Sequence, residues 1–224
     1  MQGVNLVFTI IILILSVVAH EVSHGYAAYL MGDSTAKRAG RLSMNPFRHL
    51  DMVGSFIVPL ALILLRSSFV FGWAKPVPYN PHNLRNQKWG PGLVGASGPF
   101  SNFLIAGFFA IVNLLLPLDL AAKQEIGMAA ITGAGIFGAG YVSALFYFSA
   151  TVIWINLFLG IFNLIPIPPL DGSKLLFSFL PYKWSNAQSF LERYGFFILI
   201  FFIFYFSSLL LPVIFLLYRF FLGI

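Results

Sequence analysis

Hydrophobic residues along this chain form long blocks that are separated by short polar stretches. Four blocks are long and apolar enough to cross about 30 Å of hydrocarbon as helices. They cover residues 5–30, 93–116, 136–162 and 195–217. A fifth block, residues 52–71, contains Pro59 near its middle and Arg66 near its end, so it is either a further crossing or a re-entrant segment. The pattern predicts an all-α polytopic membrane protein.

The composition supports the same class. Hydrophobic residues make up 59% of the chain and charged residues only 9%, whereas soluble domains carry about 25% charged residues. We expect one integral-membrane domain over residues 1–224, with a catalytic core at about 5–175 and a C-terminal transmembrane helix at about 195–217. The absence of cysteine excludes disulfides and thiolate metal ligands. Because no basic segment precedes the first block, we interpret it as a retained span rather than a cleaved signal.

The net charge of +6 is explained by topology if residues 52–71 re-enter the membrane. Ten basic residues would then face the cytoplasm, and Lys123 and Arg219 would lie outside or at the outer end. The ten are Lys37, Arg38, Arg41, Arg48, Lys75, Arg85, Lys88, Lys174, Lys183 and Arg193. Orientation in the bilayer is a better explanation of this excess than nucleic-acid binding, so we expect no nucleic-acid partner.

A metal-binding motif lies inside the first apolar block, at His20-Glu21-Val22-Ser23-His24. Residues four apart project from one face of a helix, so His20 and His24 can bind one cation while Glu21 approaches from the side. Three titratable side chains at membrane depth are costly unless they share a partner. The motif predicts a zinc site, with Glu21 as the base that takes a proton from an attacking water.

A third ligand is expected at the same depth, towards the cytoplasmic leaflet. The candidates by chemistry are His49, His82, Asp33, Asp51, Asp119 and Asp171. Asp171 stands out because Pro166, Pro168 and Pro169 precede it and must end the 136–162 helix. Irregular backbone at membrane depth is tolerated where protein or a water-filled cavity receives it. The two remaining histidines are expected to form interface hydrogen bonds rather than a second metal site.

Together, the first motif and the stretch from Asn163 to Gly172 resemble the site-2 protease family of intramembrane metalloproteases. The resemblance implies that His20, His24 and Asp171 bind one zinc ion and that Glu21 is the general base. Gly98-Pro99-Phe100-Ser101-Asn102 is similar to a third family element, which lies near the active site. The chain looks like the small members without PDZ or nucleotide-sensing domains. We expect no nucleotide partner and a prokaryotic cell membrane, and the topology given above places the active site towards its cytoplasmic side.

This resemblance also implies the substrate class: a transmembrane helix of another protein within the lipid bilayer, cleaved after local unwinding. A membrane-embedded hairpin after the first helix is expected to pair with the extended substrate, and residues 40–44 and 75–79 are the places for its strands. Asn102 or Asn163 could donate a hydrogen bond to the oxyanion, or could instead cap a broken helix.

Two other functions fit parts of the sequence. A membrane metal transporter would also line its path with histidines and aspartates, and a catalytically inactive relative could bind transmembrane helices as an escort. Glu21 separates the first from a protease, because a protease needs it for chemistry and not for holding the metal. A stretch of the form Gly-x-Gly-x-x-Gly at residues 133–138 lacks the preceding strand that dinucleotide binding requires.

Overall fold

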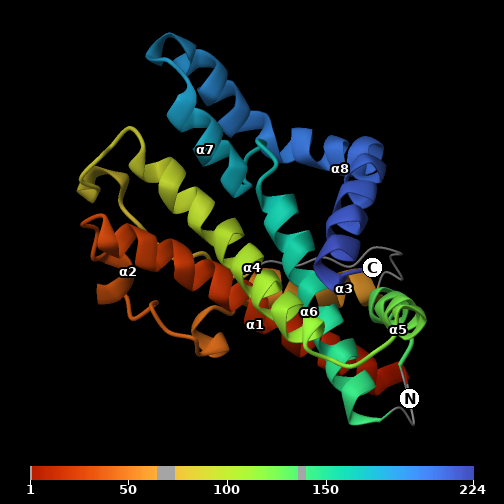
Figure 1. Cartoon of the computed structure of the whole chain (residues 1–224). Helices are drawn as coiled ribbons and strands as arrows, with labels where there is room; N and C mark the ends of the chain where they lie inside the picture. The colour runs from red at the N-terminus through yellow and green to blue at the C-terminus, as the bar shows by residue number, and fades with distance from the viewer. Residues whose placement is uncertain (1, 65–73, 136–139) are drawn as a thin grey trace.

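The computed structural model describes residues 2–64, 74–135 and 140–224, and it contains no strand in that part of the chain (Figure 1). Four helices are long and apolar enough to cross a membrane. They are α1 (Gln2–Leu30), α4 (Gly90–Leu114), α6 (Tyr141–Asn163) and the Ser185–Phe206 part of α8 (Ser185–Leu222). The predicted all-helical, multi-pass membrane architecture is confirmed.

Helix α4 is the centre of the fold, because it packs against α1, α6 and α7 (Asp171–Phe179). In Figure 1, α4 runs between α1 and α6, and α7 lies at one end of these three helices. Gly92, Gly95 and Gly98 recur every third residue on α4, and an added Cβ at any of them would meet atoms of α7 or α1 at less than 3.0 Å. Small residues at such spacing allow helices to approach closely in a membrane.

A helix that the sequence did not predict, α5 (Leu120–Thr132), lies at the end of the bundle opposite α7 (Figure 1). The Asp119 side chain accepts a hydrogen bond from the Ala122 backbone N–H and caps its first turn. Gly133, with a φ of 71°, ends it in the left-handed conformation. The charge pattern of the sequence places Lys123 outside the membrane but predicts no helix there; the segment is a capped helix that packs on α6.

The connection between α1 and α4 is built from short helical pieces and loops. They are α2 (Thr35–Arg38), η1 (Pro46–Arg48), η2 (Met52–Ile57), α3 (Val58–Leu64) and η3 (Pro81–Asn83). The question of whether residues 52–71 cross or re-enter the membrane depends in part on residues 65–73, which lie outside the described residues.

The expected strands at residues 40–44 and 75–79 are not formed as strands. The two segments are joined instead by the Arg41 guanidinium, which donates to the carbonyl oxygens of Lys75 at 3.2 Å and Pro76 at 3.3 Å. Pro76 and Pro78 have no backbone N–H, so they cannot contribute to a ladder of strand hydrogen bonds. The part of the predicted hairpin that the structure describes is therefore an irregular pair of segments.

The end of α1 is fastened to the loop before α4 by Asp33, a side chain without exposed surface. Its carboxylate accepts hydrogen bonds from the Asn80 backbone N–H at 2.6 Å, from Asn83 Nδ2 at 2.9 Å and from Thr35. Burial alone raises the pKa of Asp33, but these hydrogen bonds outweigh it and lower the pKa to about 2. The clamp fixes residues 80–83 against the cytoplasmic end predicted for α1.

Candidate metal centre

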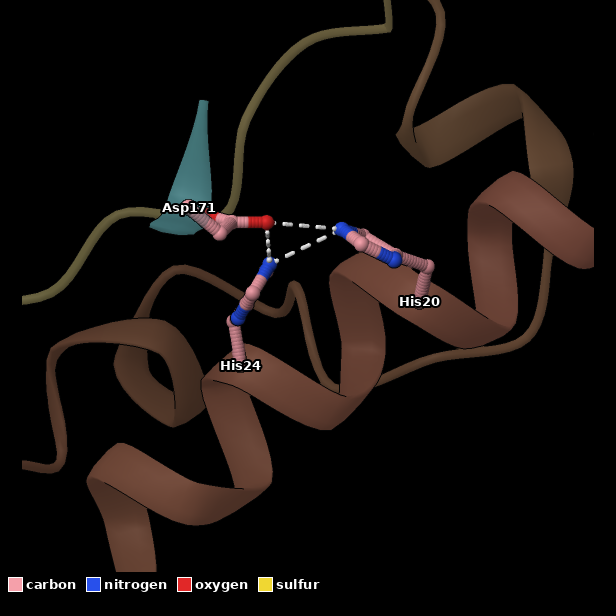
Figure 2. Close-up of side chains that lie close together, drawn as sticks. All are labelled: His20, His24 and Asp171. Carbon is pink, nitrogen blue, oxygen red and sulfur yellow. Dashed lines mark hydrogen bonds and ion pairs between the residues drawn. The ribbon is translucent and has the colours of Figure 1, made fainter. Parts of the chain in front are cut away.

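Three side chains from two distant parts of the chain converge (Figure 2), and the histidine rings lie against Gly98 of α4. His20 and His24 come from successive turns of α1, and Asp171 is the first residue of α7. Asp171 Oδ2 lies 3.0 Å from Nε2 of His20 and 3.0 Å from Nε2 of His24, and the two Nε2 atoms are 3.1 Å apart. All three residues are buried, with at most 7% of their surface exposed.

The other nitrogen of each imidazole ring is bound to an oxygen that can only accept. His20 Nδ1 is 2.6 Å from Asn102 Oδ1, and His24 Nδ1 is 2.6 Å from the Val94 carbonyl oxygen. Each Nδ1 must therefore carry the proton, which leaves the neutral ring with a lone pair on Nε2. The two Nε2 atoms and Asp171 Oδ2 thus converge on one point: a protonated ring would donate from Nε2 to Oδ2, and two neutral rings would present two lone pairs and a carboxylate oxygen to a cation.

A chain of amide side chains fixes the orientation of His20. Asn102 of α4 donates through Nδ2 to Asn156 Oδ1 at 2.8 Å, so its Oδ1 is the end that accepts from His20. Asn156 of α6 in turn donates to Ser16 Oγ, one turn before His20 on α1, at 2.9 Å. Both amides are fully buried. The network joins α1, α4 and α6, and we had not anticipated the part played by Ser16 and Asn156.

Gly98 explains why the histidine rings can lie so close to α4. A Cβ atom at this position would lie 2.6 Å from Nε2 of both His20 and His24 and 2.5 Å from Cε1 of His24. No side chain fits there without displacing the rings. The glycine that opens the third family element is thus a steric requirement of the site.

Gly172 has an equivalent role on the other side. A Cβ there would lie 2.2 Å from the Leu164 carbonyl oxygen, at the end of α6. The α7 backbone therefore passes directly against the backbone that leaves α6, and this contact sets the position of the preceding residue, Asp171.

The carboxylate of Asp171 is shared between two kinds of partner. Oδ2 points to the histidines, while Oδ1 accepts a hydrogen bond from Lys174 Nζ at 2.9 Å. Burial raises the pKa of Asp171, but the bonds to the two histidines and the charge of Lys174 outweigh it and hold the pKa well below its usual range. Burial likewise lowers the pKa of Lys174, yet the neighbouring Asp171 raises it on balance, so the pair is charged.

Glu21 follows His20 directly and lies at the edge of the cluster. Its Oε2 accepts a hydrogen bond from the backbone N–H of Val77 at 2.9 Å. Val77 is buried against α1, where the absence of a side chain on Gly25 makes room for it. The segment around Val77 therefore fixes one carboxylate oxygen of Glu21. The sequence did not predict this contact.

The remaining predicted candidates lie elsewhere, and His82 is exposed in η3. Asp33 forms the clamp described above, and Asp51 and Asp119 cap the starts of η2 and α5. His49 is 2.8 Å from the Ser43 carbonyl oxygen through Nε2. Asn163 donates to the Leu159 carbonyl oxygen at 2.9 Å, one turn back on α6. Among the described residues, the group of potential metal ligands is His20, His24 and Asp171.

The chemistry of this group fits zinc. Its potential ligand atoms lie within 4.8 Å of one another, and two nitrogen or oxygen ligands of a tetrahedral zinc ion are separated by roughly 3.3 Å. Two neutral imidazoles and one carboxylate are ordinary zinc ligands, and three of them leave a fourth position for water or substrate. The amide and carbonyl oxygens on the far side of each ring are the partners expected behind zinc-binding histidines.

Apolar spanning helices around such a cluster define a membrane metalloprotein with a glutamate placed for hydrolysis. The chain belongs to peptidase family M50, whose family model matches residues 8–205. This confirms the resemblance to the site-2 proteases, and it identifies the chain as a zinc metalloprotease rather than a transporter.

Individual relatives agree with this assignment. The candidate zinc metalloprotease YwhC of Bacillus subtilis is 35% identical over 84% of this chain and 76% of its own length. A second, Rip2 of Mycolicibacterium smegmatis, is 25% identical over 84% of this chain and 62% of its own length. One from Methanocaldococcus jannaschii is 27% identical over 80% of this chain and 76% of its own length. A comparison with the solved structures finds no match.

Proposed function

We propose that His20, His24 and Asp171 hold the catalytic zinc ion, that Glu21 is the general base, and that the substrate is a transmembrane segment of another protein. One observation carries the proposal: two histidine nitrogens and one carboxylate oxygen, each 3.0 or 3.1 Å from the others, converge in a buried site. A divalent cation at this point would be bound by all three atoms, because two neutral imidazoles and a carboxylate are ordinary zinc ligands. A bound zinc ion would lower the pKa of a water molecule and polarise the scissile carbonyl group.

Glu21 performs the proton transfers. The Val77 N–H fixes Oε2, so Oε1 is the oxygen that takes the proton of the attacking water and later returns it to the leaving amine. Fixing one oxygen restricts the rotation of the carboxylate, and proton transfer depends on such restriction because donor and acceptor must be within hydrogen-bond reach.

Asn102 acts first as a positioning residue in this scheme. Its amide group is engaged at both ends, by His20 and by Asn156, so its main task is to hold the His20 ring. The oxyanion role predicted for Asn102 or Asn163 stays a prediction. It requires either amide to exchange its present hydrogen bond for one to the substrate.

The active site faces the cytoplasm of a prokaryotic cell membrane in this proposal. Basic residues gather in the segments after α1 and around α7, as the positive-inside rule requires of the cytoplasmic side. Pro166 and Pro169 in the connection that leads to Asp171 are exposed, which supports a water path to the site from that side. Residues 75–79, beside Glu21, are the place where an unwound substrate would bind, within one domain that covers residues 1–224.

The test is cleavage of tagged transmembrane peptides by the purified protein in detergent, with bound zinc measured in each variant. We expect Glu21→Gln to keep zinc near one per chain and to lose cleavage, because the base does not hold the metal. Asp171→Ala should lose both. Glu192→Gln and Asp119→Ala, which alter carboxylates away from the cluster, are the matched controls and should keep both properties.

Two results would overturn the proposal. Cleavage that survives in Glu21→Gln would remove this residue as the base. Zinc that stays stoichiometric and tight in Asp171→Ala would remove the third ligand.

A further inference from the structure

We propose that Lys174 is a positioning residue that restricts Asp171 to a single metal-binding oxygen and so keeps one coordination position open for catalysis. This inference rests on the proposed zinc site, and it assigns a role to a side chain that the mechanism above does not use. It concerns the residue three positions after the predicted third ligand, on the same helix.

The two oxygens of Asp171 are already divided between different partners. Oδ2 lies 3.0 Å from each histidine Nε2, whereas Oδ1 accepts from Lys174 Nζ at 2.9 Å. A carboxylate with both oxygens free can bind a metal ion through either one or both. The ammonium group occupies the second oxygen, so the carboxylate offers the metal one atom.

Lys174 is held in this position along its whole length. On α7 it is one turn after Asp171, a spacing that brings two side chains together on a helix. A Cβ on Gly95 of α4 would lie 3.0 Å from the Lys174 Cβ and 3.3 Å from its Cδ, so the stem runs directly along the α4 backbone. The ammonium group lies 5.9 Å from the centre of the Tyr79 ring.

The exposed fractions of the Asp171 and Lys174 side chains agree with this assignment of one carboxylate oxygen to each kind of partner. The side chain of Asp171 is 9% exposed and that of Lys174 is 34% exposed. The carboxylate is thus removed from water, which could otherwise satisfy Oδ1, while the ammonium group keeps part of its hydration. Without Lys174, a buried oxygen beside the metal would have no donor, and the metal itself would be its nearest positive partner.

A carboxylate that binds through one oxygen determines how many coordination positions on the metal ion stay open. Two histidines and one carboxylate oxygen leave a tetrahedral zinc ion one position for water or the scissile carbonyl oxygen. A second carboxylate oxygen would bind beside that position as a fifth ligand and crowd the water or carbonyl oxygen there. Lys174 therefore acts on catalysis through Asp171 and does not itself touch the reacting atoms.

The experiment uses cobalt(II) as the bound probe, because its visible absorption is intense in four-coordinate sites and much weaker when further ligands bind. Lys174→Met keeps the length of the stem and removes the ammonium group, and Lys174→Arg keeps the charge and the donors. Lys183→Met, an exposed lysine beyond the end of α7, is the matched control. Each variant is loaded with cobalt, titrated with a chelator and assayed for cleavage after zinc reconstitution.

We expect Lys174→Met to bind one cobalt ion with a weakened visible spectrum and to lower kcat about 10- to 100-fold, the range for partners behind a metal ligand. KM should change little. Lys174→Arg should restore the spectrum and most of kcat, and Lys183→Met should match the wild type. A four-coordinate spectrum in Lys174→Met, or an equal change in Lys183→Met, would overturn the inference. Lys174→Gln gives the same test if Lys174→Met cannot be purified.

Failure of this inference differs from failure of the proposed function. If the wild-type protein bound cobalt and cleaved peptides while Lys174→Met had an unchanged spectrum, only the role of Lys174 would be wrong. If the wild-type protein bound no metal through His20, His24 and Asp171, the zinc site itself would be wrong, and Lys174 would have no ligand to position.

Discussion

Two buried regions of this protein are organised in opposite ways. The polar core consists of Ser16, His20, His24, Asn102, Asn156 and Asp171, each joined to another member by a hydrogen bond. The aromatic core, between α5, α6 and the end of α8, consists of fully buried Phe146, Ile153, Leu157, Ile214 and Tyr218, with Trp154 packed edge-on against Tyr218. The structure of the polar core depends on the direction of a few hydrogen bonds, whereas that of the aromatic core depends on close packing.

This difference implies that function and stability depend on separate residues. Apolar side chains gain little from one another in a bilayer beyond close packing, because lipid is equally apolar. A void in the aromatic core therefore weakens the fold without changing the metal ligands. A misplaced atom in the polar core changes the ligands while most of the packing persists. The following predictions test that separation, from the largest expected effect to the smallest.

Gly98→Ala should abolish zinc binding and cleavage. The new methyl group would lie 2.6 Å from both zinc-facing nitrogens, and rings that move to avoid it can no longer meet Asp171. The control is Gly107→Ala on the same helix, where nothing lies within 4 Å of the added atom. Bound zinc per chain and peptide cleavage are the measurements. A Gly98→Ala protein with normal zinc would show that the polar core tolerates a change in shape.

Phe146→Ala should leave zinc bound and reduce the free energy of unfolding by about 3 kcal/mol, the usual cost of a large cavity. Phe146 has no exposed surface and lies at the centre of the aromatic core. Phe158→Ala, on the same helix but 41% exposed, is the control and should have a small effect. Reversible unfolding in mixed micelles measures the change. Loss of zinc from the folded Phe146→Ala protein would contradict the separation.

Asn102→Leu should weaken zinc binding about 10- to 100-fold, because the His20 Nδ1–H loses the oxygen that orients the ring. Asn113→Leu provides a close control. Asn113 is also a fully buried asparagine of α4, but its side-chain nitrogen and oxygen have no partner among the described residues. Replacing an unpaired buried amide should be neutral or stabilising. Competition with a chelator measures both affinities, and equal losses would show that Asn102 acts only as core volume.

Asp33 should make stability depend on pH below about 4. Its pKa is about 2 in the folded protein against 3.8 for the free side chain, so its contribution is complete above pH 3.8 and is lost as pH falls towards 2. The contribution is on the order of 2 kcal/mol. Comparing the unfolding free energy of the wild type and Asp33→Asn across this range isolates it. A constant difference between the two proteins would contradict the assignment.

The sequence predicted that four spanning helices exist because hydropathy over 20 or more residues determines insertion. Their ends were less predictable. The last one was expected at residues 195–217, whereas its span covers Ser185–Phe206. We expected the second span to begin at residue 93, but α4 begins at Gly90, where Asn86 accepts hydrogen bonds from the backbone of Lys88 and Trp89. The short length of residues 120–132 and the three adjacent polar residues Lys123, Gln124 and Glu125 made α5 hard to predict; its stability comes from its cap and from packing on α6.

The side chains of the candidate site were recognisable because their spacing follows from the helix, or because prolines mark the end of one. The hydrogen-bond partners of these side chains could not be recognised from the sequence. The bond between Asn102 and Asn156 depends on how α4 and α6 are rotated towards each other, and no local pattern encodes that rotation. Ser16 alone gave a usable signal, since it precedes His20 by four residues and so shares its helix face.

The long distance along the chain between the two halves of the polar core has a consequence for the synthesis of the protein on the ribosome. His20 and Asp171 are 151 residues apart, and at 5–20 residues per second a ribosome needs roughly 10 to 30 s to add the second after the first. During that interval the nascent chain carries the histidine pair and Glu21 in the membrane without the third ligand. Under the proposed function, the enzyme therefore stays inactive until Asp171 has been added to the chain.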